Sequence, residues 1–157
     1  MYKRQALNGA LTVGTYDGAN IEIREAVGAD NFYLFGLREE QIQEMRKNNA
    51  YNPRACYENS EYLRRILNAV NSNMFCEKDY VLLFKVIYEE LLNRDYYFLL
   101  ADLEAFNKAL HDAEKDYTNP QKWAKKAIIN VAKIGYFSSD RAVMEYAKNI
   151  WHIKPVD

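Results

Sequence analysis

Cysteine and histidine are scarce in this chain, with two residues of each among 157. Cys56 and Cys76 lack the paired spacing of a metal site, and neither His111 nor His152 has an acidic or thiol residue at a clear ligand spacing. We therefore predict no bound metal, structural roles for both histidines, and two inert thiols in a reducing, cytoplasmic environment. The spacing leaves open a disulfide between the two cysteines.

Long apolar runs and clusters of one charge are also missing. No stretch reaches the length of a membrane span, and we expect no signal peptide. The 21 basic and 22 acidic residues are interspersed, which argues against nucleic acid or an anionic membrane as a partner. Hydrophobic residues make up 49% of the chain and aromatic residues 14%, which is enough for one globular domain with a sizeable core.

The first 36 residues have the pattern of a strand, a helix and a second strand. Residues 10–15 and 31–35 are typical of short buried strands. Residues 18–27 between them are typical of a helix that Asp17 caps and that Gly28 ends in a left-handed conformation. A unit of this kind makes the two strands parallel, with a right-handed crossover.

After this unit the periodicity is helical. We predict helices over residues 39–47, 61–69, 80–92, from 102 to about 117, 120–135 and 139–151. Residues 49–59 form a loop or a broken helix. The fold class is therefore α/β and mostly helical, with a short parallel βαβ unit followed by about five or six helices.

The residues at the start of each helix predict its N-cap, and the apolar residues on its faces predict how deeply it is buried. Asp79 starts the helix over residues 80–92, which is apolar almost all round and so belongs at the centre of a core. Asp102 and Asn119 start the next two helices, and Ser138 or Ser139 starts the last. Two parallel strands alone do not make a stable sheet, so the sequence looks like part of something larger.

Several blocks of the sequence resemble the α-glucan phosphorylases. The first is NGALTVGTYDGANIE at residues 8–22, followed by NFYLFG at residues 31–36. Later blocks are ADLEAF at 101–106, Asn119-Pro120, Trp123, FSSDR at 137–141, EYA at 145–147 and NIW at 149–151. The resemblance runs in order from about residue 7 to residue 155, while residues 39–94 match only in pattern.

This resemblance implies a GT-B glycosyltransferase with its active site between two Rossmann-like domains. Such enzymes use inorganic phosphate to release glucose 1-phosphate from α-1,4-glucan such as glycogen or maltodextrin. They carry pyridoxal phosphate on a lysine, and the cofactor's phosphate group is the acid–base partner of the substrate phosphate. By this resemblance, residues 7–157 are the C-terminal part of the second domain, and residues 1–6 are an unrelated start or a truncation joint.

The resemblance breaks at the cofactor lysine, which in the family lies four residues before the position of Asn8. This chain has Arg4 there, and a guanidinium that keeps its proton is a poor amine nucleophile. Lys3 is one position away, where its side chain points to another face. The family's loop of small residues before the lysine, which helps to hold the cofactor phosphate, is not in the sequence. We therefore expect no intact cofactor site, no bound pyridoxal phosphate and no catalytic residue in this chain alone.

Asp17 and the pair Ser138 and Ser139 are possible catalytic residues, but we predict that they cap helices. Asp17 lies at the end of a parallel strand, where α/β sites tend to lie, but we favour a helix cap. Ser138 and Ser139 precede Asp140 without a histidine beside them, and capping explains them as well.

We therefore expect a C-terminal fragment of a cytoplasmic phosphorylase that is inactive by itself, with α-glucan and phosphate as partners of the full-length parent only. The alternative is a non-catalytic interaction module that binds itself or a phosphorylase chain, and a weaker one is a sugar-binding module that uses the tyrosines. In the family the last helix packs on the N-terminal domain. Without that domain, its apolar stripe and the edge of the first strand would be uncovered, so we expect a homo-oligomer, a dimer in the simplest case, with Trp151 or the first strand in the interface. The stripe consists of Val143, Tyr146, Ala147, Ile150 and Trp151.

Overall fold

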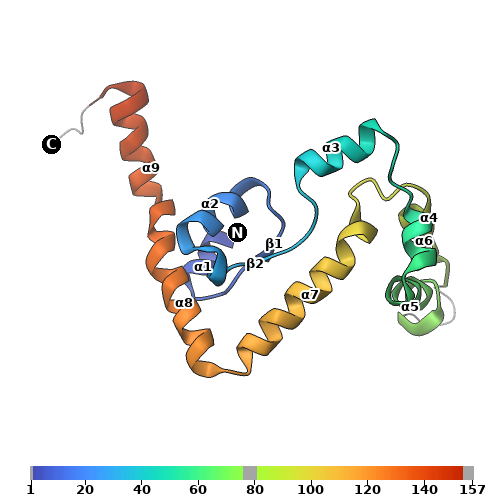
Figure 1. Cartoon of the computed structure of the whole chain (residues 1–157). Helices are drawn as coiled ribbons and strands as arrows, with labels where there is room; N and C mark the ends of the chain where they lie inside the picture. Colours follow the sequence, from blue (N-terminus) through green and yellow to red (C-terminus); the bar gives the residue numbers. More distant parts are fainter. Residues whose placement is uncertain (1, 76–80, 154–157) are drawn as a thin grey trace. The chain divides into compact units, whose positions relative to one another are not determined.

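A computed structural model of the chain describes residues 2–75 and 81–153 (Figure 1). The chain divides into two compact units, which we call the terminal unit (Met1–Leu34 and His111–Asp157) and the central unit (Phe35–Leu110). The single domain that we expect over residues 7–157 stays a prediction. No helix within the described ranges is long and apolar enough to cross a membrane.

The terminal unit contains the predicted strand–helix–strand unit. Its elements are α1 (Tyr2–Leu7), β1 (Val13–Gly14), α2 (Gly18–Val27), η1 (Ala29–Asn31), β2 (Tyr33–Leu34), the end of α7 (Leu99–Tyr117), α8 (Pro120–Ile134), η4 (Gly135–Phe137), α9 (Ser139–Tyr146) and the π-helical turn η5 (Ala147–Trp151). The strands are parallel, as predicted, with Val13 opposite Tyr33. Each has two residues, fewer than expected, because the flanking residues pair with no further strand in the described part of the chain.

Helix α2 has the predicted bounds, but both of its ends differ in detail. Asp17 occupies the N-cap position with an extended backbone, yet its side chain makes no capping hydrogen bond. Gly28 has a φ of 87° and a ψ of 151°, which is outside the left-handed helical region that we predicted. Its N–H still bonds to the carbonyl of Arg24 and closes the last turn. Glycine reaches this positive φ without a steric penalty.

The core of the terminal unit lies where α1 and α2 pack on α8 (Figure 1). Its buried residues are Ala6, Ile23, Val27, Phe32 and Ile134, with Leu34 and Phe137 packed against them. Helix α8 begins as predicted, because the side chain of Asn119 accepts a hydrogen bond from the Lys122 N–H and Pro120 takes the first helical position. Ser138 occupies the N-cap position of α9 without a side-chain bond.

The central unit is helical. It contains α3 (Glu39–Lys47), α4 (Pro53–Asn59), α5 (Glu61–Val70), η2 (Asn73–Phe75), α6 (Val81–Asn93) and the first half of α7. Helix α3 has the predicted bounds and no buried residue. The segment expected as a loop or a broken helix contains α4, because Asn52 caps it and Pro53 fits its first turn. The buried core consists of Leu63, Leu67, Leu92 and Leu100.

Two predictions for the central unit are wrong. Helix α6 packs on α4 and α5 but is not central to the core, since Val86 is 68% and Ile87 49% exposed. Asp102 does not start α7, because the helix begins one turn earlier, where the carboxylate of Asp95 accepts hydrogen bonds from the N–H groups of Leu99 and Leu100. The predicted cap Asp79 lies outside the described residues.

Candidate functional site

The first sequence block surrounds a pocket of about 270 Å³ in the terminal unit. Its lining residues come from the end of α1, the approach to β1 and the first turn of α2. They are Gln5, Ala10, Leu11, Thr12, Val13 and Asn20. The pocket therefore lies beside the segment that leads into β1 and the first turn of α2, and the turn that follows β1 does not line it.

A close contact between β1 and α2 shapes this pocket. The side-chain amide of Asn20 donates a hydrogen bond of 3.1 Å to the carbonyl of Thr15. A Cβ at Gly14 would lie 2.7 Å from the Nδ2 atom of Asn20, so a larger residue there would require the Asn20 side chain to move. Both residues belong to the first sequence block, but the sequence alone predicted no role for either. The available signal was a glycine inside a short strand, which often marks a close approach.

The position at which the resemblance places the cofactor lysine lies on α1, next to the pocket residue Gln5. Arg4 occupies it and is exposed, and its carbonyl accepts hydrogen bonds from the N–H and the side-chain amide of Asn8. An arginine at this place cannot form an imine with pyridoxal phosphate, because its guanidinium stays protonated. The described residues therefore do not fit the cofactor. The side chain of Lys3 lies outside the described part of the structure.

The other residues considered from the sequence lie on separate elements. Asp17 is exposed before α2, and Ser138 is exposed before α9. His111 on α7 lies 3.7 Å from the carboxylate of Glu114, and both side chains are exposed. The ring of His152, which follows η5, lies 3.1 Å from the carbonyl of Lys148. The structure brings none of these four candidates into contact with another.

The thiol of Cys56 gives no sign of reactivity. Cys56 forms no disulfide with another described residue, and it is half-buried in the central unit against the core of Leu63 and Leu67. Burial, assisted by the charge of Asp95, raises the pKa of its thiol, which lowers the share of the reactive thiolate. Cys76 lies outside the described residues, so the pairing of the two cysteines stays open. Within residues 2–75 and 81–153, no three His, Cys, Asp or Glu side chains form a group that could hold a metal ion.

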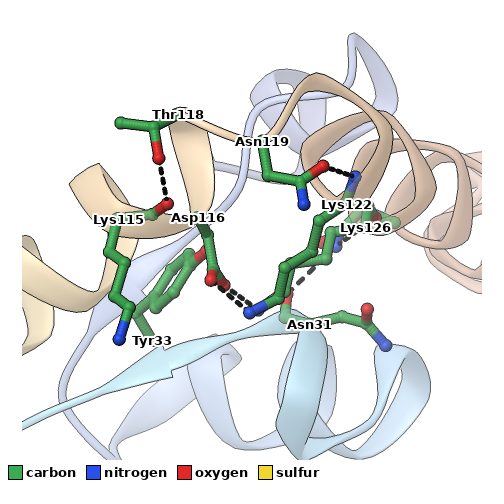
Figure 2. Close-up of polar contacts among 9 residues, drawn as sticks. Asn31, Tyr33, Lys115, Asp116, Thr118, Asn119, Lys122 and Lys126 are labelled. Atoms are coloured by element: carbon green, nitrogen blue, oxygen red, sulfur yellow. Dashed lines mark hydrogen bonds and ion pairs between the residues drawn. The ribbon is translucent and has the colours of Figure 1, made fainter.

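Sequence reasoning missed a charged cluster around Asp116 near the end of α7 (Figure 2). Asp116 is 7% exposed and accepts a hydrogen bond of 2.9 Å from the hydroxyl of Tyr33 on β2. The Nζ atom of Lys126 on α8 lies 2.7 Å from the same carboxylate, which also pairs with Lys122. The ammonium of Lys126 is 4.6 Å from the centre of the Tyr33 ring. Asp116 therefore connects β2, α7 and α8.

The electrostatics of this cluster fix its protonation state. Hydrogen bonds from Lys122 and Lys126 hold the pKa of the Asp116 carboxyl well below its usual range. Burial and the bond to Asp116 raise the pKa of Tyr33 above its usual value. Both directions favour a charged Asp116 beside a neutral Tyr33, an arrangement that stabilises the packing of β2, α7 and α8. Its members are brought together only by the tertiary fold, since Tyr33 and Asp116 are 83 positions apart.

A parallel strand–helix–strand unit that is continued by helices defines part of an α/β protein. The family model described as carbohydrate phosphorylase matches residues 3–153 of this chain. The chain therefore belongs to the carbohydrate phosphorylase family, which confirms the resemblance seen in its sequence blocks.

Curated relatives agree with this assignment. A glycogen phosphorylase of Synechocystis sp. is 44% identical over 151 residues, covering 96% of this chain and 18% of the relative. A glycogen phosphorylase of Bacillus subtilis is 41% identical over 96% of this chain and 19% of the relative. The human brain form is 40% identical, with 96% and 18% covered. The chain thus spans about 18% of the length of the curated relatives it matches.

Proposed function

We propose that this chain belongs to an α-glucan phosphorylase, an enzyme that cleaves α-1,4-glucan with inorganic phosphate to give glucose 1-phosphate. The observation that carries the proposal is the family match over residues 3–153, together with glycogen phosphorylase relatives at 40–44% identity. The chain corresponds to the C-terminal part of the second GT-B domain. Glycogen or maltodextrin is the substrate of the complete enzyme.

Within that enzyme, the turn between β1 and α2 forms part of the wall of the substrate cleft. Strand β1 ends at Gly14 and α2 begins at Gly18, so the intervening turn lies at the carboxyl end of a parallel strand. Ligands of α/β proteins bind beyond such strand ends. The bond from Asn20 to Thr15 holds this turn in place. The chain's contribution is thus to position a wall of the cleft, and we assign no proton transfer to its residues.

Pyridoxal phosphate, the cofactor of the parent family, does not bind to the 157-residue chain alone. Arg4 stands where the family has its lysine, and the described residues offer no substitute amine at that position. The isolated chain is accordingly inactive. The complete parent is cytoplasmic, and the isolated chain forms a homo-oligomer through the exposed face of its last helix.

A pair of hybrid enzymes tests this function. In the first, residues 8–153 replace the matching segment of the Synechocystis glycogen phosphorylase, which keeps its own lysine. In the second, residues 3–153 replace it and bring in Arg4. We expect glucose 1-phosphate release from glycogen by the first hybrid and none by the second. A first hybrid that folds and binds the cofactor but has no activity would contradict the proposal.

The alternative of a non-catalytic interaction module is not supported. The family match and the relatives named above are all phosphorylases. The sugar-binding module stays a weaker prediction. Binding of maltooligosaccharides to the isolated chain would support it.

A further inference from the structure

A second pocket, of about 330 Å³, lies in the central unit between the end of α3 and the segment that joins α6 to α7. Its lining combines two cations, one carboxylate, an amide, a methionine and three aromatic rings. These residues are Met45, Arg46, Asn49, Tyr51, Arg94, Asp95, Tyr96 and Phe98. A concave site of this size with a few polar groups among aromatic side chains has the features of a small-molecule site. The function proposed above makes no use of it.

The backbone around this pocket is strained. In the described part of the chain, four non-glycine residues have a positive φ, and three of them line the pocket: Asn49 (49°), Asp95 (31°) and Phe98 (60°). Asparagine and aspartate tolerate this region, but a bulky phenylalanine rarely enters it. Such strain persists only where the surroundings hold it, and it gathers at ligand sites.

Contacts around Phe98 show what holds the strain. The ring stacks on Tyr51 with 4.2 Å between the ring centres, and the Phe98 side chain is buried. The carboxylate of Asp95 accepts hydrogen bonds from the N–H groups of Leu99 and Leu100 and from the Tyr51 hydroxyl. Asp95 is 3% exposed, so its carboxylate oxygens bond within the protein and do not contact a ligand in the pocket.

Arg46 is placed in this pocket by neutral partners. Its guanidinium carbon lies 4.8 Å from the ring centre of Tyr96 and 5.4 Å from that of Phe98. Its Nη2 atom donates a hydrogen bond of 2.9 Å to the Tyr96 carbonyl. Among the described residues no carboxylate forms an ion pair with Arg46, and Arg94 has only an exposed contact of 3.9 Å with Glu90. A guanidinium that is oriented but not neutralised is suited to an oxyanion.

We propose that this pocket binds a small phosphate monoester whose organic group has a flat apolar face. The fork of Arg46 binds two phosphate oxygens, and Arg94 adds a second positive charge. The flat group lies against the aromatic lining beside Tyr96. The volume suits a molecule of one ring and one phosphate rather than a larger ligand.

Phenyl phosphate is the probe ligand. Phenol and inorganic phosphate, which each carry one of its two parts, are the control ligands. Titration of the 157-residue chain in a calorimeter should give saturable binding of phenyl phosphate that weakens as salt is added. Phenol should not bind measurably, and inorganic phosphate should bind more weakly than phenyl phosphate. Arg46→Met should weaken phenyl phosphate binding at least about tenfold. Arg65→Met, which changes an exposed arginine of α5 outside the pocket, should leave it unchanged.

The proposal fails if phenyl phosphate does not saturate the chain, or if Arg46→Met binds it as well as the unaltered chain does. Equal affinity for inorganic phosphate would also overturn it, since it would mark an adventitious ion only. If circular dichroism shows that Arg46→Met does not fold, Arg46→Lys decides the matter. That variant keeps the charge but loses the fork, and we expect binding several-fold weaker than in the unaltered chain. Unchanged binding by Arg46→Lys would overturn the proposal.

Discussion

The hydroxyl of Tyr33 on β2 donates a hydrogen bond of 2.9 Å to Asp116 on α7, 83 positions further along the chain. The same carboxylate pairs with two lysines of α8, so a single acidic group fixes one strand and two helices of the terminal unit (Figure 2). A buried carboxylate is stable only when its partners compensate for the lost hydration. The terminal unit should therefore be sensitive to the loss of any of these partners.

Tyr33→Phe should lower the free energy of unfolding by about 1.5 kcal/mol, because it removes a buried hydrogen bond to a charged group. Urea denaturation of the two proteins measures the difference. Tyr117→Phe is the matched control, since Tyr117 is 68% exposed and keeps its ring contact with Trp123. Its effect should stay within about 0.5 kcal/mol. Equal stability of Tyr33→Phe and the control would show that the buried bond contributes nothing.

Asp116→Asn should lower the free energy of unfolding by about 3 kcal/mol at pH 7, because it leaves the nearly buried ammonium of Lys126 without a carboxylate. The pKa of Asp116 is lowered in the folded state, so its contribution is complete above the unfolded-state pKa of about 3.9. It is lost as the pH falls below that value. Denaturation curves between pH 7 and pH 2 should show a flatter decline for Asp116→Asn than for the unaltered chain. If the free energy of unfolding fell equally with pH in both proteins, Asp116 would not be the source of the pH dependence. Asp140→Asn, at an exposed position, is the control.

Local signals in the sequence account for the correct part of the fold. The bounds of α2 and α3 follow from nearby turn residues and charges, and α8 follows from Asn119 and Pro120. The parallel pairing of β1 and β2 follows from the short helix between them. Each of these features depends on residues that are close in the sequence.

The features that sequence reasoning missed depend on distant partners. The partial exposure of α6 depends on which face the other helices cover, and composition alone does not say this. The cluster at Asp116 and the contact of Gly14 with Asn20 form only when separate elements meet. The pocket around Arg46 likewise joins α3 to a segment some 50 residues later.

A further prediction distinguishes Asp95, which caps α7 in the structure, from Asp102, which the sequence predicted as its cap. Asp95→Ala should destabilise the chain by about 2–4 kcal/mol, because it frees the N–H groups of Leu99 and Leu100 and removes the acceptor of the Tyr51 hydroxyl. Asp102→Ala should cost about 1 kcal/mol, since it removes only the acceptor of the Leu37 N–H. Hydrogen exchange should speed up at Leu99 and Leu100 in the first variant alone. The reverse order of stabilities would restore Asp102 as the cap.

The cofactor position can be tested on the chain itself. After incubation with pyridoxal phosphate and borohydride, mass spectrometry should find no stoichiometric adduct, because Arg4 cannot form the imine that borohydride reduces. The first hybrid enzyme, which keeps the host lysine, serves as the positive control. A stoichiometric adduct at Lys3 would show that the neighbouring lysine takes over the role.

The last helix should make the isolated chain self-associate. Its apolar stripe is exposed, with Val143 at 55%, Tyr146 at 51%, Ile150 at 60% and Trp151 at 56%. Each large apolar side chain left in water forgoes roughly 1.5–3 kcal/mol of burial, and a twofold dimer is the commonest way to recover it. We expect sedimentation at micromolar concentration to give a dimer that Ile150→Glu converts to a monomer. Lys148→Glu, at an exposed position outside the stripe, should leave the dimer intact.

Fluorescence quenching separates this dimer from a helix that has folded back on its own chain. Trp123 is the second tryptophan, so Trp123→Phe leaves Trp151 as the single reporter. In a dimer that buries the stripe, Trp151 should be shielded from acrylamide and become accessible on dilution, because dissociation depends on concentration. A helix folded back on its own chain would shield Trp151 at every concentration in a protein that sediments as a monomer. That result would contradict the dimer and would show that the apolar stripe packs against other residues of the same chain.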